Sequence, residues 1–203
     1  MFKNEHDHLL RKLFSDFELV KGDILVGSCP EEIKNELSNI VDEMYKIKNS
    51  PLHWIRTINT NVAGNVNKRY YIPPSLLSNT MFSYFLREYG RHYLNVKYPD
   101  HNFKIGINSL TDPLYVDIWM NFYENGNSTS LHDHGAILSG IVFCSTNDKP
   151  TPTTFENGVN IFGNFGDICI FPSKLQHENA IYLGEDDRIT ISFNLAVERN
   201  DQK

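Results

Sequence analysis

The second half of the sequence consists of short β-type segments separated by turn residues, and this pattern constrains the fold more than any other feature. Segments rich in β-branched and aromatic residues lie at 114–123, 136–144, 159–163, 167–171 and 188–195. Turn-forming pairs such as Asn157-Gly158 and Gly166-Asp167 separate them. Several short strands at such close spacing are typical of an antiparallel sandwich or barrel.

The first hundred residues have a different pattern, in which apolar residues recur at helical spacing. Three segments show this spacing, namely 5–17, 31–48 and 75–98. A chain of 203 residues is expected to form one domain, because domains contain about 150 residues on average and all-β units are often larger. We therefore predict a single domain, 1–203, in which a helix-rich part, 1–102, packs as a helical layer on a β-barrel core, 103–197.

Composition excludes several classes of partner. The chain carries 19 basic and 25 acidic side chains, and the resulting net charge of −6 disfavours nonspecific binding to nucleic acid. No stretch approaches the ~18 consecutive apolar residues of a membrane span, and the first residues lack the apolar core of an export signal. Three cysteines without CxxC spacing indicate structural thiols in a reducing compartment. We expect a cytoplasmic protein without a membrane or nucleic-acid partner.

The most specific local feature is the pair His132 and His134, followed 43 positions later by His177. On a β-strand, side chains two residues apart point to the same side, so both members of the pair face one way and Asp133 faces the other. His177 follows the apolar segment 167–171, and a neighbouring strand of a barrel can bring it to the same place. Three imidazoles with open coordination positions describe a catalytic metal site better than a closed structural one.

Alternation also predicts a polar face on the last β-type segment. Arg188, Thr190, Ser192 and Asn194 share one face, and the apolar residues between them share the other. A guanidinium next to a hydroxyl can bind a carboxylate, the arginine with two hydrogen bonds and the threonine with one more. The alternative is an exposed arginine at the start of a strand.

Two more polar residues precede the histidine pair on a predicted strand. Asn121 and Tyr123 share a face of the segment 114–123, so an amide and a phenol can point into the same cavity as the histidines. The alternative for Tyr123 is a half-buried strand residue whose hydroxyl is satisfied elsewhere.

Several of these residues stand in an order that resembles the Fe(II)- and 2-oxoglutarate-dependent dioxygenases. Residues 123–134 are similar to the Y-x-x-G-x5-H-x-(D/H) signature of the prolyl 4-hydroxylase-like members, and residues 166–177 are similar to their G-x-x-x-x-F…H element. Arg188 and Thr190 resemble the R-x-S pair that holds the far carboxylate of 2-oxoglutarate. A group of bacterial and phage 2-oxoglutarate oxygenases shows the same order over residues 119–194, including an L-S-G element at 138–140.

The resemblance implies a mainly β fold, a double-stranded β-helix (a cupin-like jelly roll) with supporting helices. It implies Fe(II) bound by His132, His134 and His177, with 2-oxoglutarate between the metal and Arg188. Further contacts to this cosubstrate would come from Asn121, Tyr123, Ser139 and Thr190. With O2, such an enzyme hydroxylates its substrate, here a peptidyl residue or a small molecule, and releases succinate and CO2.

Two positions depart from the family pattern. The second metal ligand of the superfamily is usually a carboxylate, whereas His134 stands there in this chain. A bulge in the strand would be needed to turn Asp133 toward the metal instead. Phe143 stands where related enzymes often have a tyrosine that binds the cosubstrate, so that role must fall to Tyr123 or Thr190 or be absent.

Two other functions are compatible with the same residues. One is a three-histidine cupin-type dioxygenase that does not use 2-oxoglutarate. The other is a noncatalytic jelly-roll module, for binding or as a component of a virion, with a structural or vestigial metal site.

Overall fold

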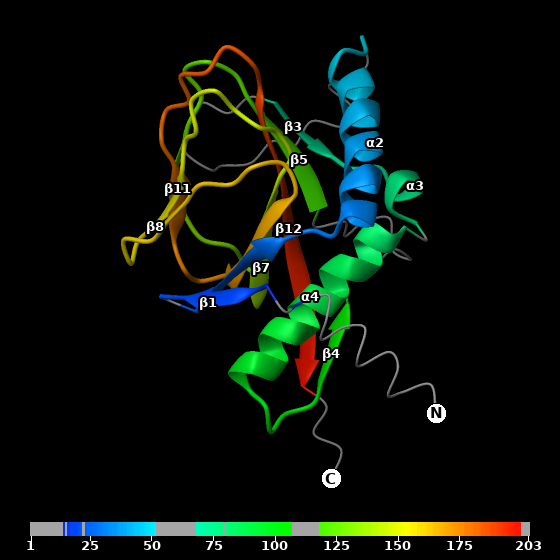
Figure 1. Cartoon of the computed structure of the whole chain (residues 1–203), viewed down its shortest axis with the longest axis vertical. Coiled ribbons are helices and arrows are strands. Elements are labelled where there is room, and N and C mark those ends of the chain that lie inside the picture. The colour runs from blue at the N-terminus through cyan, green and yellow to red at the C-terminus, as the bar shows by residue number, and fades with distance from the viewer. Residues whose placement is uncertain are drawn as a thin grey trace.

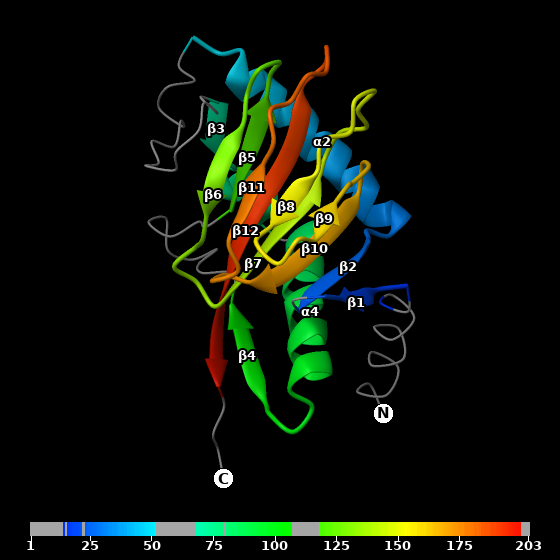
Figure 2. The ribbon, with the colours of Figure 1, turned by 90° about the vertical axis from the view of Figure 1, so that its left-hand side faces the viewer.

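Two antiparallel β-sheets face each other in the computed structural model (Figures 1 and 2). The model describes residues 14, 16–21, 23–51, 68–78, 80–106 and 118–199. The larger sheet has the order β1-β2-β10-β7-β12-β5-β3, and β4 pairs with the far end of β12. The smaller sheet has the order β6-β11-β8-β9.

The strands of the larger sheet are β1 (Glu18–Val20), β2 (Ile24–Ser28), β3 (Lys68–Tyr71), β4 (Phe103–Gly106), β5 (Ile118–Tyr123), β7 (Leu138–Phe143), β10 (Asp167–Pro172) and β12 (Arg188–Arg199). Those of the smaller sheet are β6 (Thr129–His132), β8 (Thr153–Phe155), β9 (Asn160–Ile161) and β11 (His177–Asn179). The helices are α2 (Glu31–Lys48), α3 (Pro74–Leu77) and α4 (Met81–Lys97). The described part of the chain is therefore mainly β with supporting helices, as the sequence predicts.

Strand β12 lies inside the larger sheet and separates the apolar core from a polar interior. It pairs with β7 on one side and β5 on the other. Ile189, Ile191 and Phe193 belong to the main hydrophobic core, which includes the buried residues of α2 and α4. The residues between them face the smaller sheet, where Thr190 and Ser192 line a cavity. The alternation predicted for this segment is confirmed.

Helices α2 and α4 cover the face of the larger sheet that is turned away from the smaller sheet (Figure 2). The bounds of α2 are those of the predicted segment 31–48, because two glutamates follow Pro30 at its start and its apolar residues keep a strict helical spacing. The helix buries Ile33, Leu37, Ile40, Val41 and Met44. No helix within the described residues is both long and apolar enough to span a bilayer.

The predicted helix at 75–98 is interrupted in the structure. A short helix, α3, ends before Ser78, whose backbone is extended, and α4 begins only at Met81. Thr80 causes the restart, because its Oγ1 accepts a hydrogen bond from the amide of Ser83 at 3.1 Å. The carboxylate of Glu36 in α2 accepts hydrogen bonds from the two preceding amides, those of Met81 at 3.2 Å and Phe82 at 2.7 Å. The predicted helix at 5–17 falls almost entirely outside the described residues.

The N-terminal part contributes strands as well as helices. β2 pairs with β10, and β3 pairs with β5, so both extend the larger sheet. Sequence periodicity did not indicate these strands, because each has five residues or fewer and gains its partner only from the second half of the chain. The placement of β3 matters for function, because it adds a side chain to the cavity between the sheets.

The three cysteines are buried and unpaired, as predicted for structural thiols. Burial raises the pKa of Cys29 and of Cys169 to about 12, so both remain protonated at neutral pH.

We predict that Thr80→Ala lowers the free energy of unfolding by about 1 kcal/mol, because the amide of Ser83 loses its capping acceptor. Chemical denaturation followed by circular dichroism measures this change. Thr80→Ser is the matched control and should retain most of the stability; equal losses in both variants would contradict a capping role.

Candidate metal centre

Three histidine side chains converge at one end of the smaller sheet. His132 ends β6 and His177 begins β11, and the two residues are directly opposite each other in the ladder. His134 lies two residues beyond β6. Their ligand nitrogens all lie within 4.8 Å of one another, and the Nε2 atoms of His134 and His177 are 3.4 Å apart. The predicted convergence of the three histidines is confirmed.

Backbone carbonyls orient two of the rings. The Nδ1 of His132 lies 2.8 Å from the carbonyl oxygen of Ser130, and the Nδ1 of His177 lies 3.3 Å from that of Leu175. A carbonyl oxygen only accepts hydrogen bonds, so Nδ1 must carry the proton in both rings. Each Nε2 therefore presents a lone pair, which is the form in which histidine binds a metal.

The surroundings keep the imidazoles neutral. Burial, followed by repulsion from the other histidines, lowers the pKa of His177 to about 3. The same two causes lower the pKa of His134 to about 4. Burial also lowers the pKa of His132. A protonated imidazole must lose its proton before it can bind a metal. Rings that are neutral at physiological pH therefore favour metal binding.

Asp133 lies outside this cluster. Its carboxylate pairs with the exposed Lys174 at 3.4 Å, and its side chain is 41% exposed. The register between β6 and β11 shifts by one residue before His132, and Asp133 nevertheless points away from the histidines. In the part of the chain that the structure describes, the donor set at this place is thus three neutral histidines, with His134 where related enzymes usually have a carboxylate.

Aromatic rings surround the histidines. The ring of Trp119 lies 5.8 Å from that of His134, between centroids. Phe155 and Phe171 lie 5.6 and 4.9 Å from the ring of His177. These contacts restrict the rotation of the imidazoles and limit the access of water to them.

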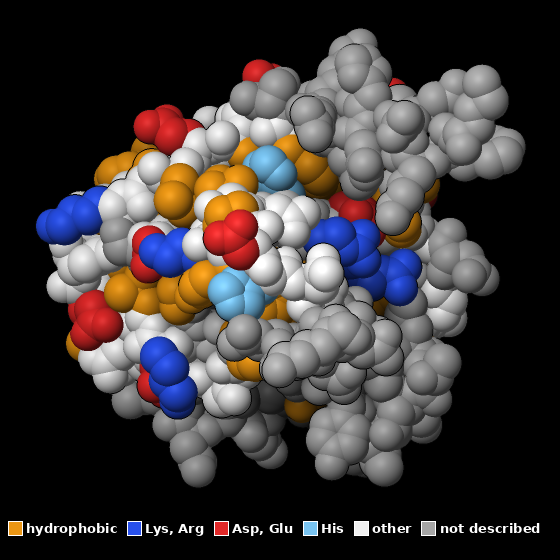
Figure 3. Space-filling view, turned by 90° about the horizontal axis from the view of Figure 1, so that it is seen from below, with side chains coloured by type: hydrophobic (Ala, Val, Ile, Leu, Met, Phe, Trp, Pro, Cys, Tyr) orange, Lys and Arg blue, Asp and Glu red, His pale blue; other side chains and the backbone are white. Residues whose placement is uncertain are grey.

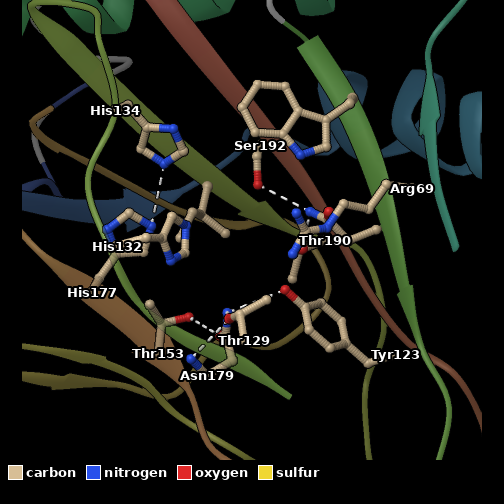
Figure 4. A pocket seen from close by; sticks show the side chains of 13 residues that line it. Arg69, Tyr123, Thr129, His132, His134, Thr153, His177, Asn179, Thr190 and Ser192 are labelled. Atoms are coloured by element: carbon tan, nitrogen blue, oxygen red, sulfur yellow. Dashed lines mark hydrogen bonds between the residues drawn. The ribbon is translucent and has the colours of Figure 1, made fainter. Parts of the chain in front are cut away.

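A cavity of about 110 Å³ extends from the histidines into the space between the sheets. Figure 4 shows the histidines on one wall and Tyr123, Thr190 and Arg69 on the opposite wall. The remaining lining residues are Trp119, Asn121, Thr129, Ile141, Thr153, Asn179 and Ser192. Among the described residues the lining contains no carboxylate, so its charge at neutral pH is positive.

A hydrogen-bonded network closes the end of the cavity that is remote from the histidines. The Nδ2 of Asn179 donates to the hydroxyl of Tyr123 at 3.1 Å and to Oγ1 of Thr129 at 2.8 Å. Its Oδ1 accepts from the hydroxyl of Thr153 at 2.8 Å. That hydroxyl in turn accepts from Nη2 of Arg188 at 3.2 Å. The network joins the two sheets.

Arg188 is buried behind this network, with 2% of its surface exposed. Its guanidinium lies 4.9 Å from the ring centre of Tyr123 and 5.8 Å from that of Phe143. Burial lowers its pKa, and its Nη1 has no hydrogen-bond partner among the described residues. An exposed arginine is therefore excluded. A buried cationic group with a free donor is costly unless an anion binds it, so the site fits a carboxylate ligand.

Of the other residues predicted to contact the cosubstrate, Asn121 lines the cavity and Ser139 does not. Asn121 lines the cavity and donates from Nδ2 to Oγ1 of Thr190 at 3.1 Å and to Oγ of Ser192 at 3.0 Å. Ser139 is not part of the lining, and its hydroxyl is engaged by Ser173 at 2.7 Å and Asn194 at 2.6 Å. A structural role accounts for this serine.

Sequence reasoning missed four polar residues of the cavity, namely Arg69, Thr129, Thr153 and Asn179. Asn179 follows His177 by two residues on β11, so alternation alone could have placed it on the same face. Arg69 and Thr153 enter the site through strand pairing across long stretches of sequence, and no local pattern indicates them.

The comparisons with known proteins agree with this geometry. Residues 147–194, which include His177, Arg188 and Thr190, match a family model described as "Putative 2OG-Fe(II) oxygenase". A prolyl-4-hydroxylase from Pseudomonas putida has a similar structure, with a TM-score of 0.56, 11% identity, and coverage of 94% of this chain and 99% of that chain. No curated protein matches the sequence significantly.

Two further solved structures are similar to this chain. A prolyl hydroxylase from Trichoplax adhaerens, in complex with a peptide fragment of the hypoxia-inducible factor oxygen degradation domain, has a TM-score of 0.53 and 12% identity, with coverage of 98% and 92%. The α-ketoglutarate-dependent epimerase SnoN from nogalamycin biosynthesis has a TM-score of 0.58 and 12% identity, with coverage of 94% and 81%.

These likenesses establish the predicted fold, the double-stranded β-helix of the 2-oxoglutarate oxygenases. The family match covers residues 147–194 and the solved structures show the fold, so the chain is similar to 2-oxoglutarate-dependent non-haem iron oxygenases. That class implies Fe(II), 2-oxoglutarate and O2, and the three-histidine cluster fits the iron.

We predict that His134→Ala weakens binding of a divalent metal by about 100-fold or more, because loss of a ligand exceeds the ~10–100-fold cost of losing an outer-shell partner. Isothermal titration with Mn²⁺ under anaerobic conditions measures the affinity. Asp133→Asn is the control and should leave it unchanged, since this carboxylate points away from the cluster. A larger loss in the control than in His134→Ala would place the carboxylate in the metal site.

Proposed function

We propose that the protein is an Fe(II)- and 2-oxoglutarate-dependent dioxygenase that hydroxylates a peptidyl residue or a small molecule. The observation that carries the proposal is one cavity with three convergent histidines on one wall and the unpartnered Nη1 of a buried arginine behind its far end. A dicarboxylic oxo acid has the chemical groups that such a site would bind, a chelating end for a metal and a second carboxylate for Arg188.

In this proposal each part of the cavity has a separate task. His132, His134 and His177 hold the iron through their Nε2 atoms. Arg188 binds the far carboxylate of 2-oxoglutarate, and Tyr123 supplies the phenol that the family often places at Phe143. The bound iron and 2-oxoglutarate supply the oxidising chemistry, in which O2 is consumed, succinate and CO2 are released and one oxygen atom enters a C–H bond.

The walls of the cavity support this chemistry by position and by exclusion of water. Asn121 fixes the hydroxyl of Thr190 by a hydrogen bond, so this hydroxyl is oriented before a ligand arrives. The rings of Trp119, Phe155 and Phe171 keep water from the histidines and thereby protect a reactive oxidant. No additional acid or base is needed from the chain.

The neutral ligand His134 changes the electrostatics of the centre. With a carboxylate in its place, the ligand set would carry one negative charge, whereas three histidines carry none. The metal centre is therefore one unit more positive, which strengthens its attraction for the dianionic cosubstrate.

The prime substrate would react at the histidine end of the cavity. A cavity of about 110 Å³ is well below the ~300–1,000 Å³ of a drug-sized site, so it has room for the cosubstrate but not for a second whole molecule. The side chains of His132 and His134 are partly exposed, so this end of the cavity is accessible. Figure 3, a view from below Figure 1, shows histidine side chains at the surface between hydrophobic and charged ones. A side chain of a peptide or a small molecule could be presented there, as the peptide-bound prolyl hydroxylase suggests.

The test is an anaerobic titration of the metal-free protein with Fe(II) and 2-oxoglutarate, monitored by the visible charge-transfer absorption of the chelate. The absorption should appear, and Arg188→Ala should weaken 2-oxoglutarate binding by about 30-fold or more, because a buried charge loses its partner. Arg87→Ala, on α4 and remote from the cavity, is the control and should bind normally.

Other outcomes separate the alternatives. Iron binding without the absorption would identify a three-histidine dioxygenase that does not use 2-oxoglutarate. The absence of both would favour the noncatalytic jelly-roll module.

A further inference from the structure

A second arginine, Arg69, is part of the lining of the cavity and has no role in the proposal so far. It lies on β3, where it pairs with Asn121 of β5, and 7% of its surface is exposed. Its side chain points into the cavity from the wall opposite the histidines (Figure 4). No local sequence pattern indicates this residue.

The two arginines approach the cavity from different places, Arg69 as part of its lining and Arg188 from behind its far end. Arg69 and Arg188 lie on either side of β5, opposite Asn121 and Tyr123 respectively. Asn121 and Tyr123 are two residues apart, which is roughly 7 Å along β5. The strands β3 and β12 are two strand spacings apart, which is roughly 10 Å across the sheet. The backbones of the two arginines are thus roughly 12 Å apart.

Arg69 is the arginine nearer the metal end. Along β5 the side chains that face the cavity are Trp119, Asn121 and Tyr123, in that order, and Trp119 is the one beside His134. Arg69 pairs with Asn121, the middle residue of the three, whereas Arg188 pairs with Tyr123, the residue farthest from His134.

We infer that Arg69 binds the oxo-acid end of the cosubstrate, through the carboxylate that chelates the metal, while Arg188 binds the far carboxylate. The inference rests on the proposed function. The shared lining supports it, because Arg69 and the three histidines border one cavity of about 110 Å³, in which the proposed function places the cosubstrate. A guanidinium matches a carboxylate oxygen that is not used for chelation and would hold the plane of the chelate fixed.

The test compares two ligands that share the oxo-acid end. 2-Oxoglutarate has both carboxylates, and 2-oxobutanoate lacks the far one. Binding to the Mn²⁺-loaded protein is measured by isothermal titration. Arg69→Ala should lose about 10-fold or more in affinity for both ligands, as expected for loss of a charge-assisted contact. Arg188→Ala should lose affinity for 2-oxoglutarate alone.

A spectroscopic readout gives an independent answer. At saturating Fe(II) and 2-oxoglutarate, Arg69→Ala should shift the wavelength of the charge-transfer absorption, because the chelating carboxylate loses a hydrogen bond. At saturation, Arg188→Ala should show the wild-type wavelength, but saturation should require a higher concentration of 2-oxoglutarate. Arg69→Lys keeps the positive charge and should restore part of the affinity; it also serves if the alanine variant does not fold.

Three results would overturn the inference while leaving the proposed function intact. Unchanged binding and an unchanged wavelength in Arg69→Ala would exclude a cosubstrate contact. Loss confined to 2-oxoglutarate would move Arg69 to the far carboxylate. Reduced Mn²⁺ affinity without ligand would make Arg69 a structural support of the histidines. Failure of the wild-type protein to bind 2-oxoglutarate would instead reject the proposed function.

Discussion

The alternation of side chains along β12 is the constraint on which the rest of the structure depends. One face of this strand packs against the helices through Ile189, Ile191 and Phe193, and the burial of these side chains fixes its register. A shift by one residue would turn Arg188 into the apolar core. Because the register is fixed, the polar face is held toward the smaller sheet, where it lines the cavity.

The sequence was sufficient for the residues whose position follows from local periodicity. The spacing of His132 and His134 predicts their common direction, and the alternation of β12 predicts the inward face of Arg188 and Thr190. Both predictions depend only on the period of two in a strand. Helix α2 was predictable for the same kind of reason, since its apolar residues repeat over five turns without interruption.

Other features depend on contacts between distant segments, and no local pattern contains them. Arg69 reaches the cavity only because β3 pairs with β5, some fifty residues later. The break before α4 arises from the cap at Thr80, which a run of apolar residues on both sides obscures in the sequence. Ser139 shows the opposite case, in which a residue in a family-like motif is engaged by Ser173 and Asn194. The family-like motif drew attention to Ser139, but the residues packed around this serine determine which groups its hydroxyl contacts.

The network centred on Asn179 has a consequence for the order of events. It seals the arginine end of the cavity, where Tyr123, Thr153 and Arg188 are almost fully buried, while the histidine end remains partly exposed. A ligand can therefore enter this cavity only from the histidine end. Under the proposed function, the cosubstrate that reaches Arg188 would have to enter first and the prime substrate after it, so the shape of the cavity would impose an order of binding.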